Sequence, residues 1–303
     1  MTMKQEISGL VLKGIGGFYY VQTEETVYEC KARGLFRKQS VSPLAGDRVK
    51  LETEENQDAV ITEIMPRKNV LTRPPIANLD QLAIVAASCS PAPNTLVIDK
   101  TIAAAENQGI APILILTKTD LEQVQWLRDI YEPIGFPVVL VSSVTGEGVD
   151  RVKELLKGKT TAFTGNSGVG KSSLLNRIDE RLGLETGEIS RKLGRGRHTT
   201  RQVELFALEG GGYVADTPGF SAIQLERYHV VRKEQLPYCF REFRPYLDQC
   251  RFPSCSHTCE KGCAVLQAVE EGKISRSRHN NYLALYQEVK DLKEWDKKGN
   301  AAL

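Results

Sequence analysis

Short apolar segments rich in β-branched and aromatic residues dominate the first part of the chain, separated by polar or glycine-bearing turns. No long stretch with a helical period lies between them, so the pattern predicts strands. The expected strands are residues 7–14, 17–23, 26–33, 47–54 and 59–65. Five short strands in about sixty residues favour a small closed β-barrel of the OB type, a fold that commonly binds oligonucleotides. An SH3-like barrel would produce a similar pattern.

A second pattern begins near residue 68, within a three-proline segment, residues 66–78, that we expect to be a linker. Apolar runs then alternate with amphipathic stretches. The expected strands are residues 79–88, 111–120, 137–143, 160–164 and 210–216, and the expected helices are residues 94–109, 121–135 and 148–158, with another ending near residue 178. Strands that are apolar throughout and separated by helices predict a mostly parallel sheet covered on both faces.

From about residue 230 the pattern changes to a cysteine-rich loop followed by helical stretches. We therefore expect three units: an OB-type barrel in residues 1–67, an α/β domain in residues 68–229 and a small helical module in residues 230–303. No run approaches the roughly 18 apolar residues that cross a bilayer, and the first ten residues lack the apolar core of a secretory signal. We expect a cytoplasmic monomer with no membrane contact.

Composition adds little to this picture, since 41% hydrophobic and 26% charged residues are ordinary for a folded soluble protein. The net charge of +2 excludes no partner, because basic residues gather in runs that are either solvated surface or sites for an anionic partner. The runs are Lys31, Arg33, Arg37 and Lys38; Arg191, Lys192, Arg195, Arg197 and Arg201; and Lys273, Arg276 and Arg278.

The segment GNSGVGKS matches the Walker A pattern and stands between a predicted strand and a predicted helix. In such a loop, backbone N–H groups wrap the phosphates, the lysine reaches the β and γ oxygens, and the serine ligates Mg²⁺. The candidate phosphate-binding residues are Gly165, Asn166, Ser167, Gly168, Val169, Gly170, Lys171, Ser172 and Ser173. The string alone can arise by chance, but these flanks make chance a poor explanation.

The segment DTPG follows a predicted strand at the position of the second phosphate-sensing motif of P-loop enzymes. Asp216 there can hold the shell of Mg²⁺, and the N–H of Gly219 can meet the γ-phosphate. Between the two motifs, Thr199 and Thr200 offer hydroxyls that can join Mg²⁺ when their loop closes. A DxxG motif alone is not evidence for a nucleotide site. Its distance after a Walker A loop is what indicates one.

The segment TKTD, comprising Thr117, Lys118, Thr119 and Asp120, ends an apolar strand. An aspartate there can accept the N1–H and the exocyclic amine of guanine, while the lysine stem lies along the purine face. Adenine has no such pair of donors. Ser142, Ser143 and Val144 end the next strand, where a loop backbone can contact the guanine carbonyl oxygen. Taken alone, TKTD could be an ordinary turn whose aspartate caps a helix.

Together these motifs resemble the TRAFAC-class GTPases, with the base-reading pair placed before the phosphate loop instead of after it. The order is circularly permuted. A permutation preserves a fold when the original termini lie close together and the new break falls in a surface loop. The resemblance implies GTP or GDP and Mg²⁺ as ligands.

Five of the seven cysteines fall between Cys239 and Cys263, which favours a metal site in a reducing compartment over disulfides. Cys250, Cys255, His257 and Cys263 form the pattern C-x4-C-x-H-x5-C, enough for one closed tetrahedral structural Zn²⁺ site. Cys259 is a possible substitute ligand and Cys239 a weaker one. The alternative is a cluster of reduced, metal-free cysteines.

The barrel, the permuted GTPase motifs and the cysteine–histidine module together resemble the bacterial ribosome small-subunit-dependent GTPase A family, over essentially the whole chain. The resemblance implies an assembly factor that binds the small ribosomal subunit through its ribosomal RNA. It also implies that GTP hydrolysis drives release from the maturing subunit. The family's nucleotide residues and zinc ligands match the positions named above.

Two positions depart from the usual GTPase pattern. Thr117 replaces the asparagine of NKxD, which removes an amide that supports the phosphate loop. Phe220 follows DTPG where a glutamine usually orients the attacking water, and its side chain can neither donate nor accept a hydrogen bond. The resemblance points to His198 as the catalytic residue; the alternative is an ordinary polar residue in a basic loop.

Two other functions remain possible from the sequence. The absent glutamine permits a GTP-sensing RNA-binding module that does not hydrolyse nucleotide. A P-loop ATPase or kinase is the second alternative, against which TKTD argues.

Overall fold

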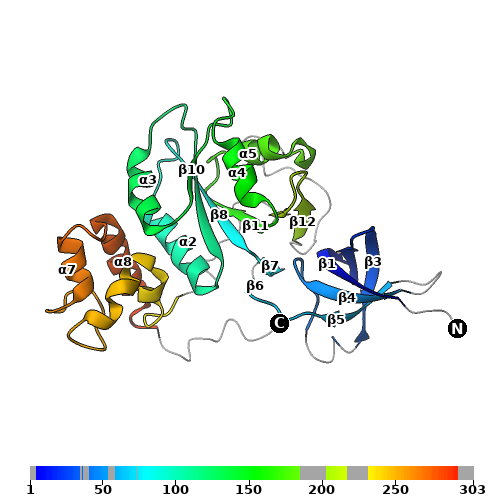
Figure 1. Cartoon of the computed structure of the whole chain (residues 1–303), viewed down its shortest axis with the longest axis horizontal. Coiled ribbons are helices and arrows are strands. Elements are labelled where there is room, and N and C mark those ends of the chain that lie inside the picture. Colours follow the sequence, from blue (N-terminus) through cyan, green and yellow to red (C-terminus); the bar gives the residue numbers. More distant parts are fainter. Residues whose placement is uncertain are drawn as a thin grey trace.

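The computed structural model describes residues 5–34, 36, 41–53, 59–72, 74–184, 203–216 and 231–292. Figure 1 shows the β-barrel at one end, a central α/β domain and a helical C-terminal module at the other end. None of the helices in these ranges has the length and apolar composition that crossing a bilayer requires.

The N-terminal barrel closes in the strand order β1-β2-β3-β5-β4, with β3 and β5 as its parallel pair. This confirms the predicted OB-type topology. Its core is a cluster of apolar side chains including Val11, Val21, Leu51 and Ile61, which are fully buried. The strands are β1 (Gln5–Ile15), β2 (Phe18–Gln22), β3 (Val27–Ala32), β4 (Arg48–Thr53) and β5 (Ala59–Ile64).

The segment expected to be a linker is instead structured. Strands β6 (Val70–Thr72) and β7 (Pro75–Ala77) pair as an antiparallel hairpin. The barrel packs on it so closely that a Cβ at Gly46 would lie 2.0 Å from the Ala77 carbonyl oxygen. Three prolines indicated a linker, but the pairing partner and the barrel contact are tertiary features that composition does not carry.

The central domain holds a six-stranded sheet in the order β10-β9-β8-β11-β13-β12. All its pairs are parallel except β12 with β13, and β12 is a strand that the sequence analysis did not predict. The strands are β8 (Gln81–Ala87), β9 (Ala111–Thr117), β10 (Val138–Leu140), β11 (Thr160–Thr164), β12 (Glu204–Ala207) and β13 (Tyr213–Asp216).

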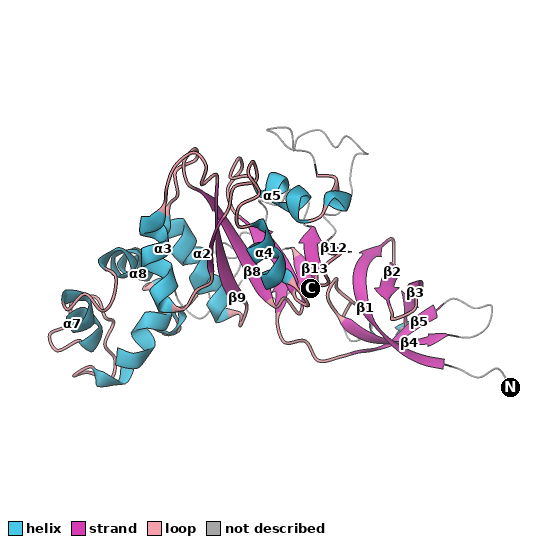
Figure 2. Cartoon of the chain, turned by 45° about the horizontal axis from the view of Figure 1, so that its top comes forward, coloured by secondary structure: helices cyan, strands magenta, loops and turns pink. Residues whose placement is uncertain are grey.

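Helices cover both faces of this sheet, as predicted (Figure 2). Alternate residues of β8 enter two separate cores because successive strand side chains point to opposite faces. Leu82 and Ile84 pack on the face of α2 (Thr95–Asn107) and α3 (Gln125–Tyr131). Ala83 and Val85 pack on the opposite face, against the helices α4 (Val149–Leu156) and α5 (Lys171–Ile178). Short 3₁₀ turns follow α3 and α5, at η1 (Glu132–Ile134) and η2 (Glu180–Leu182).

The C-terminal module builds its own core around Phe240, Phe243 and Tyr282 and buries part of α2 with them. Its elements are η3 (Leu236–Cys239), η4 (Arg241–Gln249), α7 (Ala264–Glu270) and α8 (Arg276–Val289). Figure 1 shows this module beside α2, on the side of the central domain away from the barrel.

One member of a predicted basic surface run is buried. Arg278 is 1% exposed and forms ion pairs with Asp99 of α2 and Glu242 of η4. Charge runs usually lie on solvated faces, but here α8 packs on α2 and turns this residue inward. The interpretation of Arg278 as part of a basic surface is therefore wrong.

Candidate nucleotide and metal sites

The predicted nucleotide motifs meet at one edge of the central sheet. β8, β9, β11 and β13 are mutually parallel, so their carboxyl ends lie together. TKTD ends β9, the phosphate loop follows β11, and Asp216 is the last residue of β13. Ligands of open α/β sheets bind at this edge. The order of these segments along the chain therefore does not keep Thr117, the phosphate loop and Asp216 from lying at one edge of the sheet.

The phosphate loop is a tight turn that leads directly into α5. Gly165 has φ of +145°, and a Cβ there would lie 2.2 Å from the Val85 carbonyl oxygen, so only glycine fits. Lys171 is 7% exposed, and its Nζ donates to the carbonyls of Gly165 and Asn166 at 2.7 and 2.6 Å. Burial lowers the pKa of Lys171 to about 8. Asn166, Ser167 and Gly168 are exposed, as backbone donors for phosphate must be.

Thr117 contacts the phosphate loop directly. Its hydroxyl donates to the Val169 carbonyl oxygen at 2.5 Å and lies 3.3 Å from the Ala86 carbonyl oxygen. The side chain is 1% exposed, so this bond is shielded from water. The amide of the usual asparagine is absent, as the sequence indicated, and in this structure the Thr117 hydroxyl makes a hydrogen bond to the phosphate loop.

The remaining residues of TKTD form a turn in which the side chains differ in their exposure to solvent. Lys118 adopts a left-handed φ of +59°, its carbonyl accepts the Ser88 hydroxyl at 2.7 Å, and its Nζ donates to the Ser90 carbonyl at 2.5 Å. Asp120 is exposed, and the Thr119 hydroxyl oxygen is a buried atom without a hydrogen-bond partner in the described structure. The Asp120 carboxylate is thus open to a ligand at the edge of the sheet.

The loop after β10 lies next to TKTD, since the Thr119 N–H donates to the Val141 carbonyl at 3.3 Å. Ser142 is fully buried, and its hydroxyl accepts the Thr145 N–H at 3.1 Å. Ser143 is half-buried and Val144 is 75% exposed. The predicted base-contacting loop is therefore buried at its first residue and increasingly exposed at the next two.

A segment that the sequence analysis passed over lines a cavity beside the phosphate loop. Pro91, Ala92 and Pro93 line this cavity together with Gly165 and Asn166. The segment connects β8 to α2, and Asn94 ends it by accepting two N–H groups of the first turn of the helix. A strand end followed by prolines and a cap residue was the available signal, since that position faces the ligand edge of a parallel sheet.

His198, Thr199, Thr200 and Gly219 lie outside the described residues. Asp216 is described as the end of β13, opposite Glu204 in the antiparallel ladder. Their roles at Mg²⁺ and the γ-phosphate stay predictions.

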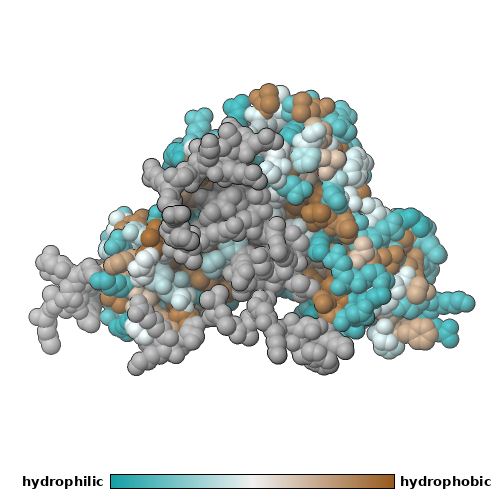
Figure 3. Space-filling model, turned by 180° about the vertical axis from the view of Figure 1, so that it is seen from behind, coloured by the Kyte–Doolittle hydropathy of each residue, from teal (hydrophilic) through white to brown (hydrophobic). Residues whose placement is uncertain are grey.

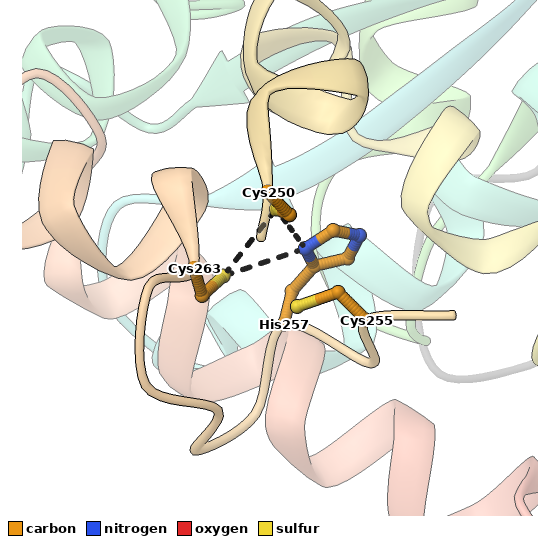
Figure 4. Close-up of side chains that lie close together, drawn as sticks. All are labelled: Cys250, Cys255, His257 and Cys263. Atoms are coloured by element: carbon orange, nitrogen blue, oxygen red, sulfur yellow. Dashed lines mark hydrogen bonds between the residues drawn. The ribbon is translucent and has the colours of Figure 1, made fainter. Parts of the chain in front are cut away.

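The four predicted metal ligands lie together in the C-terminal module, as Figure 4 shows. Their ligand atoms all lie within 4.8 Å of one another. Bonds of about 2.3 Å to sulfur and 2.0–2.1 Å to nitrogen in a tetrahedral Zn²⁺ site require S–S and S–N separations of roughly 3.8 and 3.6 Å. The Cys250 and Cys263 sulfurs are 3.9 Å apart, and His257 Nδ1 lies 3.6 and 3.5 Å from them. The four donors fit Zn²⁺ in chemistry, and the Cys250, His257 and Cys263 atoms also have the separations that it requires.

The surrounding loop is held in the ligand geometry by further contacts. The Ser256 hydroxyl donates to Glu260, as do the N–H groups of Ser256 and Cys259 at 2.8 and 3.1 Å, and despite its partial burial these bonds hold the pKa of Glu260 at about 2. His279 Nε2 lies 2.9 Å from the His257 carbonyl oxygen. Cys259, the predicted substitute ligand, is exposed and outside the cluster.

Cys239 is also outside the cluster. It is buried in the core of the module, where its thiol contacts the Gln235 carbonyl at 3.4 Å. Neither substitute ligand is needed.

Comparison with known proteins gives a consistent result. A family model described as the RsgA GTPase matches residues 64–226, and one described as the RsgA N-terminal domain matches residues 8–61. Proteins named small ribosomal subunit biogenesis GTPase RsgA include one from Caldanaerobacter subterraneus subsp. tengcongensis that is 48% identical over 95% of this chain and 97% of its own length. One from Ruminiclostridium cellulolyticum is 45% identical and covers 95% of each chain.

Two solved structures share the fold. The crystal structure of YjeQ from Thermotoga maritima superposes with a TM-score of 0.82 at 35% identity, covering 95% of this chain and all of that one. YloQ, described as a circularly permuted GTPase, gives a TM-score of 0.80 at 36% identity, covering 95% of this chain and 96% of that one.

Proposed function

The chain belongs to the RsgA GTPase family, and from that premise we propose that it hydrolyses GTP during late maturation of the small ribosomal subunit. The observation that carries the proposal is the hydrogen bond between Thr117 and Val169, which joins the base-reading strand to the phosphate loop. The base-reading motif precedes the phosphate loop in this chain instead of following it, and the bond between them supports the proposal that the two motifs serve one site.

Guanine is the base that this site suits. The exposed Asp120 carboxylate can accept two donors, which guanine offers and adenine does not. Asp120→Asn exchanges an acceptor for a donor and should transfer affinity from GTP to xanthosine triphosphate. Unchanged GTP affinity in this variant would remove TKTD as the base-reading motif and reopen the ATPase or kinase alternative.

Two metals accompany the nucleotide in this proposal. Ser172, Asp216 and one of Thr199 and Thr200 would hold Mg²⁺ beside the phosphates, where the ion neutralises developing charge. One Zn²⁺ per chain would be bound by Cys250, Cys255, His257 and Cys263. That site is closed by four protein ligands, so the zinc would hold the module together and take no part in hydrolysis.

Ribosomal RNA is the proposed contact on the subunit. One lysine of the barrel lies over an aromatic ring, with the Lys31 Nζ 5.4 Å from the centre of the Phe18 ring. In the C-terminal module, Arg251 lies 5.4 Å from the ring centre of the exposed Phe252. Cations paired with aromatic rings suit an RNA strand, whose phosphates and base faces both need partners.

The surface of the C-terminal module is of the kind that suits a polar partner. On the face seen in Figure 3 the module is mostly hydrophilic, with scattered apolar residues. We propose that the three units with bounds 1–67, 68–229 and 230–303 act within one cytoplasmic monomer, with the outer two holding RNA and the central one the nucleotide.

Hydrolysis with and without purified small ribosomal subunits, over a salt series, tests this function. Turnover of GTP should be slow in the free protein, on the order of 10⁻⁴ to 10⁻² per second, and should rise when subunits are added. The stimulation should fall steeply with salt, since phosphate contacts release counterions. Absence of turnover under every condition would instead favour the GTP-sensing module, and stimulation insensitive to salt would favour a contact made through ribosomal protein.

A further inference from the structure

Helix α5 contacts both ends of the predicted nucleotide site. Its first residue, Lys171, belongs to the phosphate loop. One residue before its other end, Arg177 donates from Nε to the Ser143 carbonyl at 3.0 Å and from Nη2 to the Val144 carbonyl at 3.2 Å. The helix has eight residues and is held against α4 by a shared core. A short rigid element therefore connects the phosphate loop to the loop after β10.

The backbone donors of this loop divide into two groups. The N–H groups of Ser142 and Gly146 bond to carbonyls within the loop at 3.1 and 2.8 Å. Those of Thr145 and Glu147 bond to side-chain hydroxyls of the loop at 3.1 and 3.3 Å. In the part of the chain that the structure describes, the N–H groups of Ser143 and Val144 have no acceptor. The loop thus uses its own donors at every position except the two that Arg177 holds.

Arg177 also determines how one of these two donors, the Val144 N–H, is presented. The carbonyl of Ser143 and the N–H of Val144 belong to one planar trans peptide and point in opposite directions. Holding the carbonyl toward α5 therefore turns the N–H away from the helix. The second guanidinium bond fixes the next peptide in the same way, and its N–H is the one that Ser142 accepts. A loop held at both carbonyls keeps the open Val144 N–H in place before a ligand arrives.

We propose that Arg177 is a positioning residue for guanine specificity, which orients the Val144 N–H group toward the carbonyl oxygen at position 6 of guanine. This inference rests on the proposed binding of guanine nucleotides. Adenine carries an amine at that position, which is a donor facing a donor. Asp120 is proposed to accept the N–H donors of the same base, so acceptor and donor groups of the site each favour guanine over adenine independently.

Equilibrium binding of GDP and ADP to Arg177→Ala tests the proposal. The affinity for GDP should fall roughly three- to tenfold, the range expected for one net hydrogen bond, while the weak affinity for ADP should stay unchanged. In hydrolysis assays the loss should appear in KM for GTP rather than in kcat. Arg177→Lys, which keeps one donor group, should retain part of the selectivity.

Arg151→Ala provides the matched control, because Arg151 is an exposed arginine on the neighbouring α4 whose 2.7 Å ion pair with Glu154 stays within its own helix. It should leave both nucleotides unaffected. Equal loss of GDP and ADP in Arg177→Ala would show that the residue only supports the phosphate loop, and unchanged GDP affinity would show that it does not act on the base; either result overturns the inference. Asp120→Asn measured alongside separates this from a failure of the proposed function, since only that variant should gain xanthosine diphosphate.

Discussion

Arg278 of α8 places its Nη1 2.6 Å from Oδ1 of Asp99 in α2, and these two side chains are 1% and 0% exposed. The same guanidinium donates to Glu242 from Nε at 2.7 Å, and Asp99 also accepts the Tyr131 hydroxyl at 2.7 Å. A buried ion pair with all its partners satisfied thus joins the central domain to the C-terminal module.

Removing Arg278 should destabilise the protein strongly. Arg278→Ala leaves Asp99 as a buried charge without its main partner, a change that costs about 3–5 kcal/mol. Lys100→Ala is the control, because the Lys100–Glu288 pair spans the same two helices but is partly exposed and should contribute less than about 1 kcal/mol. Denaturant unfolding measures both. Similar losses in the two variants would contradict the role assigned to burial.

The Thr117 hydroxyl should be needed for nucleotide affinity. Thr117→Val keeps the shape of the side chain but leaves the buried Val169 carbonyl without its donor, at a cost of about 1–3 kcal/mol. We expect weaker GDP binding and a less stable phosphate loop, measured by calorimetry and by amide hydrogen exchange of that loop. Thr117→Ser retains the hydroxyl and should bind normally. Full affinity in the valine variant would show that the bond contributes nothing to the site.

Nucleotide binding should take up a proton near pH 8. Burial lowers the pKa of Lys171 from its ordinary 10.5 to about 8 in the free protein, whereas a bound phosphate favours the charged ammonium. The affinity for GDP should therefore fall as the pH rises through about 8. Between about pH 8 and 10.5 the unfolded chain binds more protons here, so this group makes the nucleotide-free protein more stable as the pH rises.

Calorimetry in buffers of different ionisation enthalpy measures this proton uptake directly. Lys171→Arg, which stays charged across the range, should show none of it, and an equal uptake in that variant would assign the proton to another group.

One zinc per chain should copurify with the protein. Cys255→Ser should lose it and loosen the C-terminal module, because the short loop depends on its four ligands. Cys259→Ser should keep it, because Cys259 is exposed and lies outside the cluster. Elemental analysis of freshly purified protein decides the matter. Chelation should leave nucleotide binding largely intact, since the phosphate loop and TKTD lie in the central domain.

His198→Ala should abolish most of the hydrolysis that small subunits stimulate. We propose that the imidazole orients the attacking water, since Phe220 cannot, and positioned groups of this kind commonly contribute 10²- to 10⁴-fold. Nucleotide binding and docking on the subunit should persist, so the variant should bind without being released. Cosedimentation with subunits and single-turnover hydrolysis measure the two steps. Full stimulated activity would return His198 to an ordinary position in a basic segment.

The sequence by itself determined the chemistry that depends on local spacing. A Walker A loop between a strand and a helix, four metal ligands within fourteen positions and five short strands in succession are each encoded by neighbours in the chain. The OB-type barrel, the covered and mostly parallel sheet and the grouping of the four cysteine and histidine ligands followed from them and are found in the structure. Local sequence patterns predict these features correctly because turn geometry and ligand spacing are compatible with few other structures.

Only the tertiary structure decided which distant residues meet. The β6–β7 hairpin packs against the barrel. The Thr117 hydroxyl donates to a carbonyl 52 positions away in the sequence, and Arg177 donates to Ser143, which lies 34 positions earlier. The sequence pattern predicts Arg278 as a surface charge. In the structure α8 packs on α2, and Arg278 contacts Asp99, which lies 179 positions earlier in the sequence. No local pattern marks such contacts, because the free energy that forms them comes from burying whole elements together, and the individual side chain follows.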